Sequence, residues 1–235
     1  MNRLFVLVEG QTEESFVKEV LGPHLLQHGF VDVAPRLLGN ARAKARRGGI
    51  TKWPKARQDI LKRLKEDPSV CVTTFIDYYA LPEKKGDGWP GRAESSALVS
   101  ADAAAKANHV EAAISADISK KMKGNLHPHR FVPFVMMHEF EALLFSDCNG
   151  FAKGTCQPEL GSAFQAIRDA FSTPEDINDH KETAPSKRVE GLIPGYQKPL
   201  LGNLAALEIG LEVMVSQCPH FAGWVAKLEA IGSTG

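Results

Sequence analysis

The chain has 235 residues, of which 43% are hydrophobic, and its 28 basic residues balance 28 acidic ones. This length and composition suit one large domain or two small ones, and they exclude a disordered chain. Electrostatic recognition of nucleic acid must therefore come from local clusters rather than from net charge. The apolar runs are too short for a membrane span, and the first residues lack the pattern of a signal peptide. Four cysteines without metal-ligand spacing favour free thiols, so we expect a cytoplasmic protein.

The first 149 residues alternate between predicted strands and predicted helices. Short apolar runs that end at glycine or at an acidic residue are typical of strands buried on both faces of a sheet. Such runs predict strands at residues 3–9, 30–38, 69–77 and 130–137. Helical spacing predicts helices at 12–28, with Thr12 as its N-cap, at 52–66 and at 94–122. This order predicts an α/β domain, residues 1–149, with a mainly parallel sheet flanked by helices.

The pattern changes at about residue 150. Segments 158–171, 198–218 and 220–231 have helical spacing, are joined by proline-rich and asparagine-rich connections, and have no convincing strand among them. We therefore expect residues 150–235 to form a helical C-terminal region that packs on the α/β domain.

Acidic residues follow three of the predicted strands. Ligands of open parallel sheets gather at the carboxyl ends of the strands, so these side chains are expected to meet there. A further acid lies one turn into the first helix, on its sheet-facing side. Clustered carboxylates repel one another unless a cation lies between them, and such hard oxygen ligands suit Mg²⁺ or Mn²⁺. The expected metal ligands are Glu9, Glu13, Asp77, Glu139 and Glu141.

Several of these acids also have ordinary structural interpretations. Acids in a first helical turn are favoured by the helix dipole, and we assign that role to Glu14. Asp77 is equally well explained as the cap of the following turn. His138 and Glu141, three residues apart, form a possible surface pair. Glu9 is harder to explain in this way, because it follows five apolar residues and so needs a partner, either a lysine or a metal ion.

Six segments carry a resemblance to a known family. They are "VEGQTEESFV", "TTFIDYYALP", "HEFEALLFSD", "PEDIN", "APSKR" and "CPHFAGWVAKLE". In this order they resemble the DUF4276 family, a bacterial family regarded as TOPRIM-like and related to the nuclease domain of the OLD family. The resemblance implies a TOPRIM-like Rossmannoid fold that binds Mg²⁺ for phosphodiester chemistry. By resemblance, Glu9 is the glutamate after the first strand, Glu13 is the acid one helical turn later, and Asp77 is the first aspartate of an Asp-x-Asp pair.

The chain departs from this pattern at Tyr79, which occupies the position of the second aspartate. A neutral phenol is a poor Mg²⁺ ligand. Either one metal ion suffices, or Glu139 and Glu141 supply the missing oxygens, or the site has lost catalysis; we favour the second interpretation.

This interpretation predicts metal-assisted hydrolysis of a phosphodiester. Glu9, Glu13, Asp77 and one of the two later glutamates, Glu139 or Glu141, would hold one or two ions. His138 either acts as a general acid or base, or holds a neighbouring glutamate in place. Topoisomerase chemistry is less suitable, because it needs a nucleophilic tyrosine on additional domains.

Two basic segments are candidates for binding nucleic acid. Residues 36–57 carry eight lysines or arginines and no acid, and a Gly-Gly pair there lets the backbone approach phosphate closely. The second segment combines "APSKR" (184–188) with "GYQKP" (195–199), before the last helical region. The alternative interpretation is a solvated flexible loop for the first segment and a structural clamp between the two halves of the chain for the second. In the loop at 81–91, Trp89 is a candidate for stacking on a base. The candidate nucleic-acid-binding residues are Arg42, Lys44, Arg46, Arg47, Lys52, Lys187, Arg188 and Lys198.

Two functional hypotheses from different classes remain open. The first is a Mg²⁺- or Mn²⁺-dependent nuclease acting on DNA, in defence against foreign DNA beside a partner ATPase. The second is a non-catalytic adaptor that binds such an ATPase or nucleic acid, and Tyr79 favours it. A hydrolase of small phosphate compounds with Asp77 as nucleophile is a third interpretation, but it lacks the usual second aspartate.

Overall fold

The computed structural model describes residues 2–39, 51–84, 86–98, 102–177, 180 and 182–234. Its strands are β1 (Asn2–Val8), β2 (Phe30–Leu37), β3 (Val70–Asp77), β4 (Phe131–Val132) and β5 (Val135–Met136). Its α-helices are α1 (Gln11–Phe16), α2 (Gly22–Gln27), α4 (Trp53–Glu66), α5 (Arg92–Ser96), α6 (Ala103–Lys121), α7 (Glu141–Leu144), α8 (Cys148–Gly154), α9 (Gly161–Arg168), α10 (Pro185–Leu192), α11 (Asn203–Ile209), α12 (Leu211–Gln217) and α13 (Pro219–Ser233). Short helical turns complete it: π turns η1 (Val17–Leu21) and η5 (Lys198–Gly202), and 3₁₀ turns η2 (Pro128–Arg130), η3 (Pro158–Leu160) and η4 (Pro174–Asp176).

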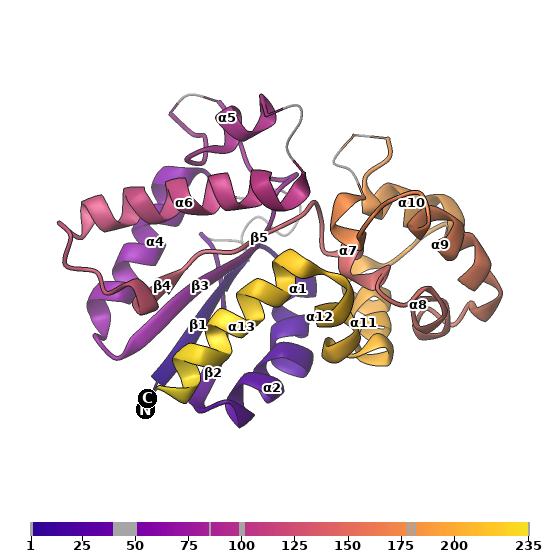
Figure 1. The fold of residues 1–235 in the computed structure, drawn as a ribbon, viewed down its shortest axis with the longest axis horizontal. Coiled ribbons are helices and arrows are strands. Elements are labelled where there is room, and N and C mark those ends of the chain that lie inside the picture. The colour runs from indigo at the N-terminus through magenta and orange to yellow at the C-terminus, as the bar shows by residue number, and fades with distance from the viewer. Residues whose placement is uncertain are drawn as a thin grey trace.

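The sheet has the strand order β2-β1-β3-β4, β5 also pairs with β3, and every pair is parallel. One face of the sheet packs on α4 and α6, and the other packs on α1, α2 and α13, so that helices cover both faces (Figure 1). All eight residues of β3 are buried, which explains why its sequence is continuously apolar or β-branched. The predicted α/β class with a mainly parallel sheet is therefore confirmed.

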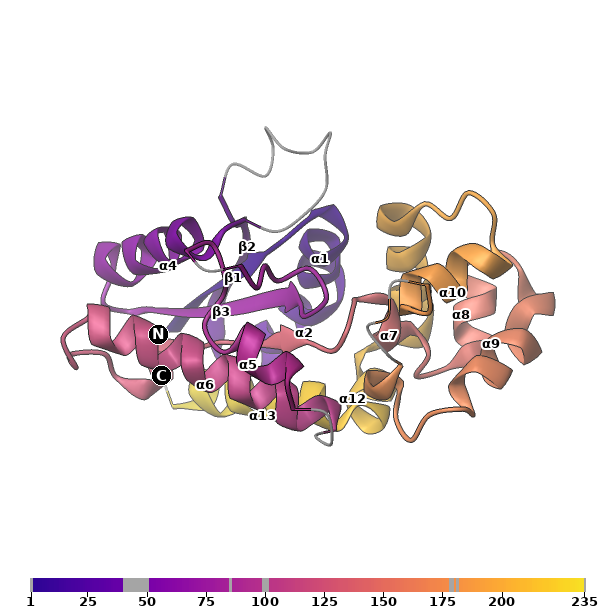
Figure 2. The ribbon, with the colours of Figure 1, turned by 90° about the horizontal axis from the view of Figure 1, so that it is seen from above.

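The remaining helices gather beyond the carboxyl ends of the strands. In Figure 2 the arrow of β3 points toward α7, and α8, α9 and α10 lie farther in the same direction. The apolar cluster on the α13 face of the sheet continues into this helical group through Phe145, Phe151 and Phe164. Phe151 and Phe164 stack at a ring-centroid distance of 4.2 Å. The carboxyl-end edge of the sheet is thus covered by helices.

The last helix returns to the sheet rather than staying with the helical group. Trp224 of α13 stacks on Phe134 and donates a 2.8 Å hydrogen bond from Nε1 to Oγ1 of Thr73 on β3. The two ends of the described chain meet, because Asn2 Nδ2 donates to the carbonyl of Ile231 at 2.7 Å (Figure 1). The division at residue 150 stays a prediction, and residues on both sides of it share one apolar cluster.

Several predicted element boundaries are wrong, for local reasons. Gly10, not Thr12, is the N-cap residue of α1, and Thr12 is buried in the first turn. The predicted helix 12–28 contains the π turn η1, because Pro23 lacks the N–H that an α-helical hydrogen bond requires. Its neighbour Gly22 suits the turn, since a Cβ there would lie 2.6 Å from the carbonyl oxygen of Val17.

Three longer predicted elements are each divided. The stretch 94–122 forms α5 and α6 instead of one helix. The predicted strand 130–137 is split at Pro133 into β4 and β5, because proline cannot donate to the ladder. The predicted helix 198–218 bends by 84° at Gly210, which has a φ of +80°.

The described residues contain no single helix that is both long and apolar enough to cross a membrane. The bent pair Lys198–Ile209 and Leu211–Gln217 meets that test by length and composition alone. All four cysteines are free; Cys71, Cys148 and Cys218 are buried, and Cys156 is exposed.

Candidate metal centre at the carboxyl edge of the sheet

Glu9 and Glu13 are positioned by the turn from β1 into α1. Glu9 leaves the strand directly after buried Val8, and Gly10 then starts the helix. The backbone N–H of Gly10 donates to Oε2 of Glu13 at 3.0 Å, which holds the Glu13 carboxylate over the helix start. A Cβ on Gly10 would lie 3.1 Å from that oxygen, so glycine permits the close approach. The β1–α1 connection therefore brings two carboxylates to the same place.

Asp77 is brought to the HEFE segment (residues 138–141) by parallel pairing. It is the last residue of β3, lies opposite Met136 of β5, and is 7% exposed. The pairing continues past both strands, because the N–H of Tyr79 donates to the carbonyl of His138 at 3.1 Å. Glu141 then opens α7 and is fully buried. The acids that follow β1, β3 and β5 therefore converge as expected from the sequence.

Lys198, at the start of η5, lies among these acids. Its Nζ is 2.9 Å from Oε2 of Glu141 and 3.4 Å from Oδ2 of Asp77. Lys198 is one of the residues predicted from the sequence to bind nucleic acid, and nothing in the sequence indicates that η5 folds back onto the end of β3 and the start of α7. A lysine is thus one partner of the cluster, which here means Glu9, Glu13, Asp77, Glu139, Glu141 and Lys198.

Burial and mutual repulsion shift the proton affinities of the cluster. Burial first, and then the charges of Glu13 and Glu139, raise the pKa of Glu9 from 4.5 to about 7, against the opposing charge of Lys198. Burial also raises the pKa of Asp77 well above its usual range, and it raises the pKa of Glu141. Burial alone would lower the pKa of Lys198, but the nearby acids, Glu141 first, raise it well above its usual range. The described contacts leave the cluster with more acidic than basic groups.

Several buried oxygens in the cluster have no hydrogen-bond partner. They are Oε2 of Glu9, Oδ1 of Asp77 and Oε1 of Glu141. The hydroxyl of Tyr196, outside the cluster, is also buried without a hydrogen-bond partner. Buried unpaired carboxylate oxygens are costly, and they are the ligand type that Mg²⁺ and Mn²⁺ prefer. The donor set therefore fits a hard divalent cation.

The spacing of the cluster is wider than that of a closed metal site. Among the described residues, the only three possible His, Cys, Asp or Glu ligand atoms that lie within 4.8 Å of one another belong to His24, His28 and Glu229. Lys198 Nζ lies between the carboxylates of Asp77 and Glu141, where an ion would compete with it. An ion held by all five acids would therefore need the carboxylates to move toward it.

The surroundings of three further predicted site positions differ: Glu139, His138 and Tyr79. Glu139 Oε2 accepts a 2.9 Å hydrogen bond from the N–H of Ser186 at the start of α10, which ties the HEFE and APSKR segments together. His138 is buried, and its ring meets the ring of Tyr78 edge-on at 5.7 Å. Tyr79, at the expected second-aspartate position, is 38% exposed. The phenol thus lies at the surface rather than among the buried acids.

The comparison with protein families assigns the chain. Residues 8–229 match the family model described as "Domain of unknown function (DUF4276)". This match covers nearly the whole chain and includes every acid of the cluster. The chain belongs to the DUF4276 family. Neither the curated proteins nor the solved structures gave a match.

The other basic residues proposed for nucleic acid in this DUF4276 chain have varied surroundings. Arg42, Lys44, Arg46 and Arg47 lie outside the described residues, so their role stays a prediction. Exposed Lys52 pairs with Asp87 at 2.7 Å, and exposed Lys187 pairs with Glu190 at 2.6 Å. Arg188 donates from Nε to the carbonyl of Thr183 at 2.8 Å and covers the ring of Phe171. The contacts of Arg188 match the structural-clamp alternative.

Trp89 is not available for stacking on a base. It is 3% exposed, its Nε1 donates to the carbonyl of Thr51 at 3.0 Å, and its ring packs against Trp53. The aromatic residue in the 81–91 loop therefore anchors that loop to the start of α4.

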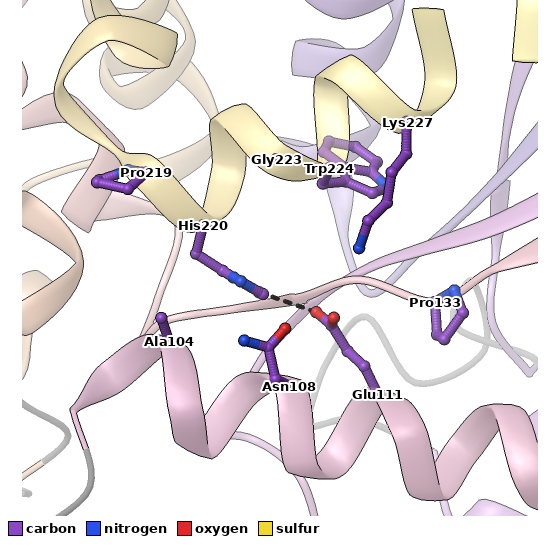
Figure 3. A pocket seen from close by; sticks show the side chains of 9 residues that line it. All are labelled: Ala104, Asn108, Glu111, Pro133, Pro219, His220, Gly223, Trp224 and Lys227. Atoms are coloured by element: carbon purple, nitrogen blue, oxygen red, sulfur yellow. Dashed lines mark hydrogen bonds and ion pairs between the residues drawn. The ribbon is translucent and has the colours of Figure 1, made fainter. Parts of the chain in front are cut away.

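A hollow of about 260 Å³ lies away from the acid cluster, between α6 and α13 (Figure 3). Figure 3 shows His220 and Glu111 facing each other across it, joined at 2.9 Å. Glu111 also accepts from the N–H of Val135, and Glu175 accepts from the N–H groups of His220 and Phe221. Glu175 thus accepts from the first N–H groups of α13, and Glu111 joins α6 to α13 and to β5. Nothing in the sequence indicates that Glu111 and Glu175 are buried, because neither acid follows a predicted strand.

Proposed function

We propose that this chain is a Mg²⁺- or Mn²⁺-dependent nuclease that hydrolyses phosphodiester bonds. The observation that carries the proposal is the convergence, at one edge of the sheet, of acids from β1, α1, β3 and the HEFE segment, with three buried carboxylate oxygens that lack hydrogen-bond partners. Buried acids with raised pKa values are typical of functional sites. The TOPRIM-like fold that the sequence resemblance implies agrees with this function, and it is part of the same proposal.

In this proposal Glu9, Glu13, Asp77, Glu139 and Glu141 hold the cation. A bound divalent ion would lower the pKa of a water molecule and neutralise charge on the scissile phosphate. The charge of Lys198 opposes the rise in the pKa values of Asp77 and Glu141, and its ammonium lies at the edge where a phosphate oxygen would bind. The hydrogen bond from Ser186 fixes the orientation of Glu139.

His138 keeps its proposed role as a general acid or base. It lies between buried Met137 and the proposed ligand Glu139, and the residue is 5% exposed. An imidazole beside a metal-bound water is suited to moving a proton to or from the reacting oxygens.

The proposed substrate is nucleic acid, with DNA as the first choice, and the proposed setting is cytoplasmic defence beside a partner ATPase. Support for a polyanion comes from the one-sided basic sequence of residues 36–57. In this proposal Arg42, Lys44, Arg46, Arg47 and Lys52 would contact phosphates without reading the bases.

Two observations favour the adaptor as the second candidate. Lys198 already neutralises part of the charge of Asp77 and Glu141, and the acids do not converge as closely as ligands of a bound ion. An adaptor would retain the fold and bind a partner ATPase or nucleic acid without hydrolysis.

Cleavage of plasmid and single-stranded DNA in Mn²⁺ tests the proposal. We expect Glu9→Gln and Asp77→Asn to lower the cleavage rate by at least about 10²-fold, because each removes a charged ligand. Glu14→Gln is the matched control. Glu14 lies in the first turn of α1 beside the proposed ligand Glu13, but it pairs with Lys18 at 2.6 Å. Circular dichroism checks that each variant folds. Intact DNA with the wild-type protein in Mg²⁺ and Mn²⁺, with and without a partner ATPase, would overturn the nuclease and favour the adaptor.

A further inference from the structure

A second group of possible metal ligands lies near the opposite edge of the sheet. His24 and His28 are four residues apart at the end of α2, and Glu229 lies on α13. Their ligand atoms all lie within 4.8 Å of one another, and each residue is partly exposed. Residues beside them mark this edge, because Phe30 begins β2 and Ile231 bonds the side chain of Asn2 at the start of β1. This group is therefore distinct from the acid cluster at the carboxyl ends of the strands.

The backbone holds the two helices in fixed contact at this point. Gly29 has a φ of +95°, and a Cβ there would lie 2.5 Å from the carbonyl oxygen of Gly232. A Cβ on Gly232 would in turn overlap the carbonyl oxygen of His28. This glycine-to-glycine approach places Glu229, one turn before Gly232, against the two histidines. The three ligands are thus brought together by the fold, not by a flexible loop.

One hydrogen bond prepares His28 for a metal ion. His28 Nδ1 lies 2.9 Å from the carbonyl oxygen of His24, so Nδ1 carries the proton and donates. The lone pair of His28 is therefore on Nε2, which lies 4.0 Å from Oε1 of Glu229. Donation from a ring N–H to a backbone carbonyl commonly orients metal-binding histidines. The two rings lie side by side at a centroid distance of 4.3 Å.

The distances from the two histidines to Glu229 lie on either side of the value that a bound metal ion requires. His24 Nε2 is 2.6 Å from Oε1 of Glu229, whereas His28 Nε2 is 4.0 Å from the same oxygen. Ligands bonded to one tetrahedral Zn²⁺ at about 2.0–2.2 Å lie roughly 3.4 Å apart. A small shift of the glutamate would lengthen the first distance and shorten the second to that value. Partial exposure of all three side chains leaves a fourth position for water.

We propose that His24, His28 and Glu229 bind a transition-metal ion of the Zn²⁺ class and thereby join α2 to α13. Two imidazoles with one carboxylate suit Zn²⁺, Ni²⁺ or Cu²⁺ far better than Mg²⁺. The ion connects helices from the beginning and the end of the chain, so its role is to stabilise the fold. The competing interpretation is a metal-free clamp in which Glu229 bonds His24 alone.

Calorimetric titration with Zn²⁺ tests the proposal, using the full-length protein without an affinity tag and after removal of metal by a chelator. We expect one saturable site in the wild type, and an affinity at least about tenfold lower in His28→Ala and in Glu229→Gln. His129→Ala is the matched control: His129 also packs against a second histidine, His127, at 4.9 Å, but both are exposed. Its affinity should equal that of the wild type.

The melting temperature gives a second readout. Zn²⁺ should raise it in the wild type, in His129→Ala and in Glu9→Gln, and should leave it unchanged in His28→Ala. Retention of Zn²⁺ binding by Glu9→Gln separates this site from the acid cluster. If His28→Ala does not fold, His28→Gln replaces it. No saturable Zn²⁺ binding by the wild type, or equal binding by folded His28 and Glu229 variants, would overturn the proposal and leave the metal-free clamp.

Discussion

Glu9 makes the charge of the acid cluster sensitive to pH near neutrality. Burial and the neighbouring acids place its pKa at about 7, compared with an ordinary value of 4.5. A raised pKa means that the folded state holds a proton that the unfolded state has already released. Between these two values the contribution of Glu9 to the stability of the metal-free protein therefore falls as the pH rises.

We predict this loss in urea unfolding measured with a chelator present. The free energy of unfolding of the wild type should fall between about pH 5 and about pH 7, with Glu9 contributing up to about 1.4 kcal/mol per pH unit. Glu9→Gln carries no titrating group at that position, so it should lose less and exceed the wild type in stability at about pH 7. Parallel pH profiles for the two proteins would contradict the assignment of Glu9 to a buried, repulsive site.

At the scale of elements, the interruption of the sheet at Pro133 is repaired by side chains of β3. Thr74 Oγ1 donates to the carbonyl of Phe134 at 2.8 Å and accepts from its N–H at 2.9 Å. Thr73 Oγ1 likewise bonds the carbonyl of Val132 and receives the indole N–H of Trp224. Two buried threonines thus satisfy the backbone where β4 and β5 leave the ladder, and they explain why a fully buried strand carries hydroxyls.

We predict that Thr74→Val lowers the free energy of unfolding by about 1–3 kcal/mol, because it leaves the N–H and carbonyl of Phe134 buried without partners. Hydrogen exchange should show faster exchange at the Phe134 amide. Thr74→Ser is the control, since it keeps the hydroxyl and should keep that amide protected. Unchanged protection in Thr74→Val would show that the threonine does not have this role.

The elements that were predicted correctly are those set by local sequence. Buried strands such as β1 and β3 are continuous apolar runs, and in a parallel arrangement their carboxyl ends must share an edge, so the meeting of Glu9 and Asp77 followed from the sequence. The position of Lys198 could not be predicted, because it depends on η5 folding back over a distance of 121 residues in sequence. The division of residues 130–137 was signalled by Pro133, and the repair by Thr74 was not.

At the scale of the whole molecule, the return of α13 joins the beginning and end of the chain. Trp224, Phe221 and Phe134 form one aromatic group with Phe75 on the face of β3. The sequence indicated an apolar helix at 220–231 but not its partner, because the periodicity of a helix does not specify which surface covers it. The helical group beyond the strand ends supplies Lys198 and Ser186 to the acid cluster, so both parts of the chain build that site.

Mn²⁺ titration without nucleic acid tests whether the acids at the carboxyl edge of the sheet share a divalent ion. The measurement uses His28→Ala as the background, so that the histidine group does not contribute. We predict one or two saturable sites, an affinity at least about tenfold lower when Glu9→Gln is added, and no change when Glu14→Gln is added. Absence of saturable Mn²⁺ binding, or equal binding with and without Glu9→Gln, would contradict the claim.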